Sequence, residues 1–125
     1  MADKTIAQKM FIKPGQNVLL VNAPKGMKET FGFVEGVKVV AKSVGPVDIQ
    51  IVFATTHAEL IQRIETAKLL MKPGGLIWLV YPKAGQLDTD LKRDSVAADA
   101  KAFGLQPAAQ IAIDEVWSAL RFKSG

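Results

Sequence analysis

The chain has 125 residues, of which 49% are hydrophobic and 22% charged, and this composition is typical of one soluble globular domain. The absence of cysteine excludes disulfides and thiolate-bound metal ions, and no apolar run approaches the roughly 20 residues of a membrane span. The net charge of +4 comes without an arginine cluster or basic residues interleaved with aromatic ones, so no nucleic acid or membrane partner is expected. The first residues lack the pattern of a signal peptide, which predicts a cytoplasmic protein.

The first half of the chain is predicted to contain short helices and largely apolar strands. Pro14 and Gly15 form a turn before the first strand, and Gly32 and Gly36 weaken the helix that follows it. The elements predicted in this half are a helix at 4–11, a strand at 17–21, a helical segment at 27–34, and strands at 37–40 and 47–53.

The clearest helix is predicted from His57 to about Met71. Thr56 and Glu59 have the spacing of a capping box, in which each side chain accepts a hydrogen bond from a free backbone N–H at the start of a helix. Apolar residues recur at helical spacing on one side of this segment, so that side is expected to pack on a sheet.

The run 76–81 is apolar without alternation, which is typical of a strand buried on both faces. Pro82 is expected to end it, because proline has no N–H to donate to a sheet. The elements predicted after it are a helix from Thr89 or Asp94 to Phe103 and strands at 105–113 and 116–122. The short turn between these strands predicts antiparallel pairing. The sequence therefore predicts one α/β domain over 1–125, a three-layer, mostly parallel Rossmann-like sheet with a C-terminal antiparallel hairpin.

Two sets of segments resemble known families. The segment 70–76, Leu-Met-Lys-Pro-Gly-Gly-Leu, is similar to the one before the fifth strand of class I methyltransferases, and this resemblance implies their Rossmann-like fold. The segments 22–26, 81–83 and 112–122 resemble small bacterial proteins grouped as a domain of unknown function, which implies no known activity.

The chain departs from the methyltransferase pattern at two places where that family binds S-adenosylmethionine. The turn at 22–26 has one glycine instead of several, and Pro24 removes a backbone donor from it. The second strand is followed by Ala41-Lys42-Ser43, without the acidic residue that would bind the ribose hydroxyls. Both departures count against S-adenosylmethionine binding of the usual kind, and the sequence leaves the cofactor unknown.

Loops after the first, third and fourth strands are predicted to share one edge of the sheet, where ligands of such folds bind. Lysines beside the N-terminus of the helix that begins near Thr56 would favour an anion there. The candidate binding residues are Asn22, Lys25, Gly26, Thr55, Thr56, Tyr81 and Lys83. The alternative is that the lysines are solvated loop residues and that Asn22 caps a turn.

Other polar residues have simpler interpretations than catalysis. His57 is the only histidine and is expected to be exposed in the first turn of its helix, although it could act as a general base. Asp94 is interpreted as a helix cap. Asp114 and Glu115 are neighbours in a turn, so their carboxylates are expected to point apart into solvent.

The leading hypothesis is a domain without catalytic activity that binds an anionic small molecule or a protein partner. The alternative is a minimal or degenerate methyltransferase-like enzyme that uses S-adenosylmethionine. A third possibility is a homodimer formed through the C-terminal strand 116–122, interpreted as an edge of the sheet, unless Arg121 and Lys123 protect that edge.

Overall fold

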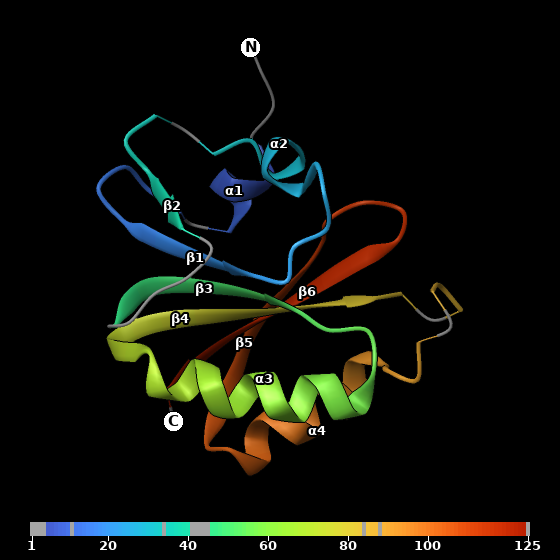
Figure 1. Ribbon diagram of the computed structural model, residues 1–125. Helices are drawn as coiled ribbons and strands as arrows, with labels where there is room; N and C mark the ends of the chain where they lie inside the picture. Colours follow the sequence, from blue (N-terminus) through green and yellow to red (C-terminus); the bar gives the residue numbers. More distant parts are fainter. Residues whose placement is uncertain are drawn as a thin grey trace.

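Six strands form one sheet with helices on both of its faces, as Figure 1 shows for the computed structural model of the chain. The structure describes residues 5–10, 12–33, 35–40, 46–83, 85–87 and 89–124. The strands are β1 (Asn17–Val21), β2 (Lys38–Val40), β3 (Val47–Phe53), β4 (Met71–Pro82), β5 (Leu105–Ala112) and β6 (Trp117–Ser124). The helices are α1 (Ile6–Lys9), α2 (Met27–Phe31), α3 (His57–Leu69) and α4 (Arg93–Ala102). The predicted fold class is confirmed.

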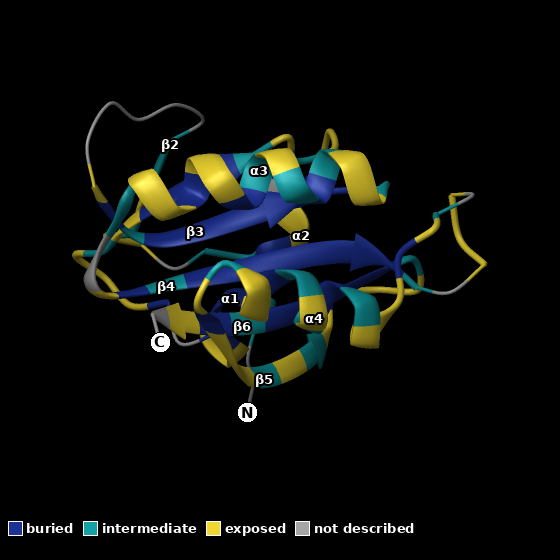
Figure 2. Cartoon of the chain, turned by 90° about the horizontal axis from the view of Figure 1, so that it is seen from below, coloured by how far each residue is buried: buried dark blue, intermediate teal, exposed yellow. Residues whose placement is uncertain are grey.

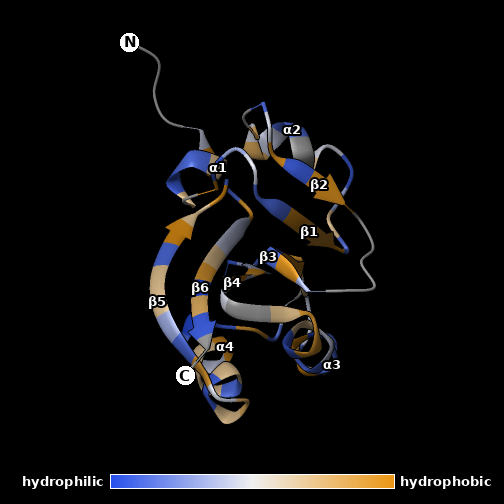
Figure 3. Cartoon of the chain, turned by 90° about the vertical axis from the view of Figure 1, so that its left-hand side faces the viewer, coloured by the Kyte–Doolittle hydropathy of each residue, from blue (hydrophilic) through white to orange (hydrophobic). Residues whose placement is uncertain are grey.

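The strands lie in the order β2-β1-β3-β4-β6-β5. β1 pairs in parallel with β2 and β3, and β3 pairs in parallel with β4. β6 is antiparallel to both β4 and β5, which confirms the C-terminal hairpin. Figure 3 shows β5 outside β6. The interpretation of the final strand as an edge was therefore wrong, because β4 and β5 pair with the two sides of β6. The homodimer itself stays a prediction.

Two apolar cores explain why the run 76–81 shows no alternation. Trp78 and Val80 of β4 pack with the core under α1 and α2, whereas Ile77 and Leu79 pack with the core under α3 and α4. Figure 2 shows β3 and β4 as buried strands. Burial of this much apolar surface is the main force that stabilises such a domain.

Helix ends follow the sequence signals at α3 but not at α4. The capping box of Thr56 and Glu59 is present, and α3 then ends two residues before the predicted limit. The N-cap of α4 is Lys92, and the backbone N–H of Lys92 donates to the hydroxyl of Ser95. The interpretation of Asp94 as a helix cap was therefore wrong, since Asp94 lies in the first turn of the helix. No helix of the described residues has the length and apolar character needed to cross a membrane.

Gln50 is the polar side chain of β3 that lies inside the core, with 1% of its surface exposed. Its amide Nε2 donates to the carbonyl of Ala67 at 2.7 Å, which ties the end of α3 to the sheet. The same carbonyl also accepts from the N–H of Leu70. The side-chain oxygen Oε1 of Gln50 has no hydrogen-bond partner among the described residues. A buried acceptor without a partner costs about 1–3 kcal/mol, so part of the benefit of the Ala67 bond is lost.

We expect Gln50→Met to leave the free energy of unfolding within about 1 kcal/mol of the wild type, because losing one hydrogen bond is offset by removing the unpaired oxygen. Gln50→Ala should cost about 2–3 kcal/mol, since it also opens a cavity. Urea unfolding of the three proteins measures both values. A loss above about 2 kcal/mol for Gln50→Met would show that the Ala67 bond dominates.

Candidate functional site

The carboxyl ends of β1 and β3 form the topological switch point of the sheet. The chain leaves β1 toward β2 on one side, and it leaves β3 toward β4 on the other. α2 and α3 accordingly cover opposite faces, as Figure 1 shows. In open α/β sheets, ligands bind in the crevice outside the strands at such a point.

The guanidinium of Arg63, from α3, occupies this crevice. Its Nη1 donates to the carbonyl of Phe53 at the end of β3, at 2.5 Å, and its Nη2 donates to the carboxylate of Glu59 at 3.1 Å. Nε and Nη2 lie 2.9 and 3.2 Å from the side-chain oxygen of Asn22, with the amide oriented so that this oxygen accepts from both. Arg63 therefore links the end of β1, the end of β3 and the first turns of α3.

Asn22 owes its place beside Arg63 to an unusual backbone conformation. Its φ is +58°, in the left-handed region that asparagine tolerates better than most residues. Gly26, with φ of +85°, ends the same turn. The turn of 22–26 is therefore fixed at both ends by residues suited to positive φ.

The N-terminus of α3 already has acceptors from within the chain. The carboxylate of Glu59 accepts from the N–H groups of Thr55 and Thr56 at 3.0 and 3.2 Å, and the carboxylate of Asp90 accepts from the N–H of His57 at 2.8 Å. The Thr55 hydrogen bond is the largest cause that holds the pKa of Glu59 below its usual range. Burial opposes it, and the charge of Arg63 adds a smaller lowering of the pKa. The N–H groups of Thr55, Thr56 and His57 are thus bonded to carboxylates, and that of Glu59 donates to the hydroxyl of Thr56.

A pocket of about 500 Å³ lies beside the end of β1, on the side of α2. The polar residues of its lining are Asn22 and Glu29, and Glu29 lies in the first turn of α2. The residues that line it are Leu20, Asn22, Ala23, Pro24, Gly26, Met27 and Glu29. Among the side chains that the structure describes, no lysine, arginine or histidine lines it.

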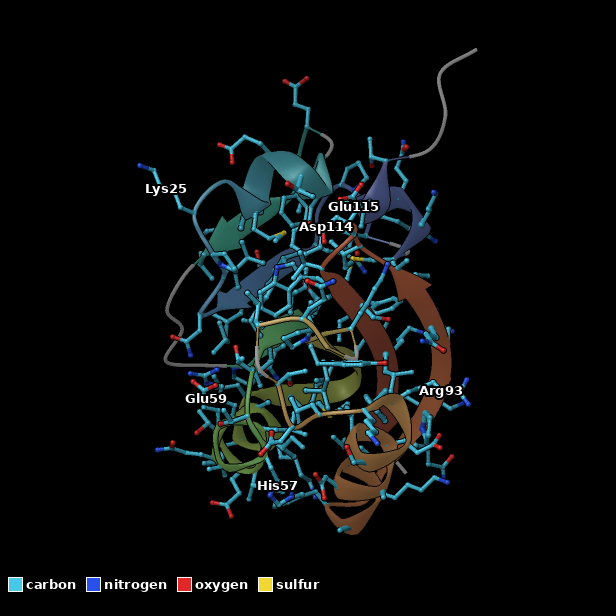
Figure 4. The ribbon with its side chains drawn as sticks, turned by 90° about the vertical axis from the view of Figure 1, so that its right-hand side faces the viewer. Lys25, His57, Glu59, Arg93, Asp114 and Glu115 are labelled. Atoms are coloured by element: carbon cyan, nitrogen blue, oxygen red, sulfur yellow. The ribbon has the colours of Figure 1, made fainter. Side chains whose placement is uncertain are left out.

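The structure brings only some of the predicted site residues together. Asn22 and Gly26 line the pocket, whereas the side chain of Lys25 projects away from the ribbon into solvent in Figure 4. The carbonyl of Thr55 accepts from the hydroxyl of Thr89 at 2.5 Å, which ties the start of α3 to the segment before α4. The backbone N–H of Lys83 donates to the carbonyl of Val116 at 2.7 Å, which ties the loop after β4 to the final hairpin.

Tyr81 lies on the face opposite the pocket, in the core under α3 and α4. Only 3% of its surface is exposed. Burial raises the pKa of the Tyr81 phenol, and a hydrogen bond with Ser118 opposes this effect in part. Tyr81 is therefore a neutral core residue at neutral pH and does not border the pocket.

The remaining candidates have structural contacts. His57 is exposed, and its Nε2 lies 3.0 Å from Oδ2 of Asp99, which links α3 to α4. Figure 4 shows His57 far from Lys25, at the opposite end of the molecule. The carboxylate of Asp114 accepts from the N–H groups of Val116 and Trp117 at 2.9 and 2.8 Å, so it shapes the hairpin turn. No group of three or more possible metal ligands occurs in the part of the chain that the structure describes.

Sequence reasoning missed the two residues that define the site, Arg63 and Glu29. Arg63 lies four residues after Glu59, a spacing at which opposite charges meet on a helix, and this spacing was the available signal. Nothing in the sequence indicated that Glu29 would line a pocket, since this depends on the path of the loop after β1.

The strand order and the helices on both faces define a small Rossmann-like domain. The chain belongs to the family described as "Protein of unknown function (DUF3052)", whose model matches residues 36–125. β1, α2 and the pocket precede the matched range. No curated protein matches the chain.

Solved structures of methyltransferases share this fold. A TehB-like SAM-dependent methyltransferase from Corynebacterium glutamicum is 8% identical, with a TM-score of 0.62 over 94% of this chain and 85% of that one. The ribosomal protein L11 methylase from Lactobacillus delbrueckii subsp. bulgaricus is 10% identical, with a TM-score of 0.63 over 94% of this chain and 73% of that one. A methyltransferase from Pyrococcus furiosus is 12% identical, with a TM-score of 0.61 over 96% and 80%. At these identities the likeness shows the fold.

We expect Glu59→Gln to lower the free energy of unfolding at pH 7 by roughly 0.5 kcal/mol. The substitution removes the negative charge that accepts hydrogen bonds from Arg63 and from two backbone N–H groups. The folded-state pKa of Glu59 lies below its unfolded value, so its contribution is present above about pH 4.3 and is lost as the pH falls through the folded pKa. The difference in the free energy of unfolding between wild type and variant should therefore disappear in acid. Urea unfolding from pH 7 downwards measures it, with the exposed Glu65→Gln on the same helix as the control. A difference in the free energy of unfolding that stays constant with pH would contradict the lowered pKa of Glu59.

The raised pKa of Tyr81 predicts a loss of stability in alkali. The folded pKa exceeds the unfolded value, so this contribution is complete below about pH 10 and is lost as the pH rises through the folded pKa. Tyr81 is the only tyrosine, so phenolate absorbance reports on it alone. We expect native protein to titrate at higher pH than protein in urea, and Tyr81→Phe to lose less stability than wild type above about pH 10. Identical titrations in the two states would refute the prediction.

Proposed function

We propose that this domain binds an uncharged, nucleoside-like small molecule in the pocket beside β1, and that binding rather than catalysis is its function. The observation that carries the proposal is the position of the pocket at the carboxyl end of β1, next to the switch point. Its volume of about 500 Å³ lies within the range of small-molecule sites.

The chemistry of the lining supports this ligand class. Leu20, Ala23, Pro24 and Met27 offer apolar surface to a planar ring. The carboxylate of Glu29 can accept hydrogen bonds from hydroxyl groups or an amine. A ligand with a flat apolar part and hydrogen-bond donors satisfies both kinds of surface.

An anionic ligand has less support from these contacts. The described side chains of the pocket lining include Glu29 and no cation. The N–H groups of Thr55, Thr56 and His57 already bond to Glu59 and Asp90. Arg63 is engaged by Asn22, Phe53 and Glu59. The anion site predicted from the sequence stays a prediction, which inorganic phosphate can test.

The likeness to methyltransferases supports a second candidate, an enzyme that uses S-adenosylmethionine. The residues of the turn do not fit the usual way of holding that cofactor. In methyltransferases, glycines at this turn let the backbone approach the cofactor. Here the turn carries the side chains of Asn22, Ala23 and Pro24, and Pro24 has no N–H to donate. The pocket can take the nucleoside part, but the described side chains of its lining include no cation for the amino-acid carboxylate. This mismatch favours binding without methyl transfer.

An amide NMR titration of the labelled protein with adenosine tests the proposal. Saturable shifts should gather at residues 20–29, with Kd below about 1 mM. Ala23→Leu should weaken the shifts because the added side chain fills the pocket, whereas the exposed Ala98→Leu on α4 should leave them unchanged. S-adenosylhomocysteine and inorganic phosphate serve as comparison ligands.

Each outcome decides between the candidates. Tighter binding of S-adenosylhomocysteine than of adenosine would favour the methyltransferase-like alternative. Saturable shifts with phosphate at 54–57 and 81–83 would favour the anion site. No saturable shift at 20–29 with either adenosyl compound would overturn the proposed pocket.

A further inference from the structure

A second pocket, of about 400 Å³, lies between the end of α2 and the edge strand β2. Figure 3 shows α2 and β2 side by side at this end of the molecule. Among the described residues of the two linings, Glu29 is the one that this pocket shares with the pocket beside β1. Its volume lies within the range of small-molecule sites.

Part of the lining of this second pocket is apolar. Phe33, Val37 and Val39 line it, and each is partly buried because it packs against the core under α1 and α2. Side chains alternate along β2, so Lys38 points to the face opposite Val39. The two valines offer apolar surface to a ligand, and the ring of Phe33 can attract a cation to its face.

The charged residues of the described lining are two glutamates, Glu29 and Glu35. Neither carboxylate forms an ion pair within the part of the chain that the structure describes. By contrast, the carboxylates of Glu59, Asp90 and Asp114 all accept hydrogen bonds from the chain itself. In a chain with a net charge of +4, two carboxylates without a counter-charge at one pocket favour a positively charged ligand.

Backbone contacts hold the turn that carries Glu35 in place. The carbonyl of the next residue, Gly36, accepts from the N–H of Gly15 at 2.8 Å. Gly36 has a φ of +93°, and a Cβ there would lie 3.0 Å from the Cβ of Pro14, so this position suits glycine. The side of the pocket that Glu35 lines is therefore built into the fold before any ligand binds.

We propose that this second pocket binds a small organic cation, an ammonium group carried on an apolar body. The ammonium group would lie between the carboxylates of Glu29 and Glu35, and the apolar body would lie against Phe33 and the two valines. A metal ion such as calcium takes about six to eight oxygen ligands, whereas this lining combines two carboxylates with apolar side chains. Phe33 and Glu35 do not line the pocket beside β1, so this site does not depend on the proposed nucleoside-like ligand.

An amide NMR titration with three compounds that share one apolar body tests the charge of the ligand. Phenethylammonium, phenethyl alcohol and hydrocinnamate carry a positive, a neutral and a negative end group. Phenethylammonium should give saturable shifts at residues 32–39 with a Kd of about 1 mM, roughly fivefold tighter than the alcohol. Hydrocinnamate should bind more weakly than the alcohol. Raising sodium chloride from about 20 to about 200 mM should weaken the binding of phenethylammonium and leave that of the alcohol unchanged.

Glu35→Gln should weaken the binding of phenethylammonium about threefold, because it removes one charge and keeps the shape of the side chain. The same variant should leave the adenosine shifts at residues 20–29 unchanged, so failure of this proposal and failure of the nucleoside proposal are seen separately. Glu65→Gln on α3, where the glutamate is also exposed, is the matched control and should change neither titration.

Three results would overturn the cation site. The first is equal affinity for phenethylammonium and phenethyl alcohol, or equal affinity of the wild type and Glu35→Gln for phenethylammonium. The second is the lack of any saturable shift at residues 32–39 with phenethylammonium. The third is saturation of the same shifts by calcium chloride at a lower concentration than by phenethylammonium, which would show a metal site instead.

Discussion

The contacts of one guanidinium, that of Arg63, determine what the switch point of this sheet can do. Arg63 reaches the carbonyl of Phe53, the carboxylate of Glu59 and the amide of Asn22, so β1, β3 and α3 meet at one side chain. About a fifth of the Arg63 side chain is exposed, and a partly buried guanidinium must have its donors satisfied. The crevice in which this class of sheet usually binds a ligand is therefore closed by the chain's own groups.

The closed crevice explains how the chain can share the fold of methyltransferases while its polar groups lie at other positions than theirs. The carboxylates of Glu59 and Asp90 accept hydrogen bonds at the N-terminus of α3, where a bound anion would otherwise accept them. A concave surface lies on the other side of β1, and its described side chains include Glu29 and no cation. A fold shared with enzymes thus does not bring their ligand chemistry with it.

The fold could be predicted further from the sequence than the site could. The apolar run 76–81, the capping box of Thr56 and the short turn before Trp117 are local signals, and each was confirmed. The edge of the sheet was predicted wrongly because strand order depends on where the hairpin inserts, which no local pattern shows. The positions of the site residues also depend on the whole fold. Tyr81 lies on the face opposite the pocket, in the core under α3 and α4. Arg63 reaches the end of β3 from the side of α3 that carries no sequence motif.

A double-mutant cycle between Asn22 and Arg63 tests the central claim that these side chains join β1 to α3. The proteins are wild type, Asn22→Ala, Arg63→Met and the double variant, and the backbone strain of alanine at positive φ cancels in the cycle. The account predicts a coupling of about 1 kcal/mol or more in the free energy of unfolding. A coupling near zero would show that Arg63 and Asn22 are neighbours without a joint role and that the crevice is not closed by their contact.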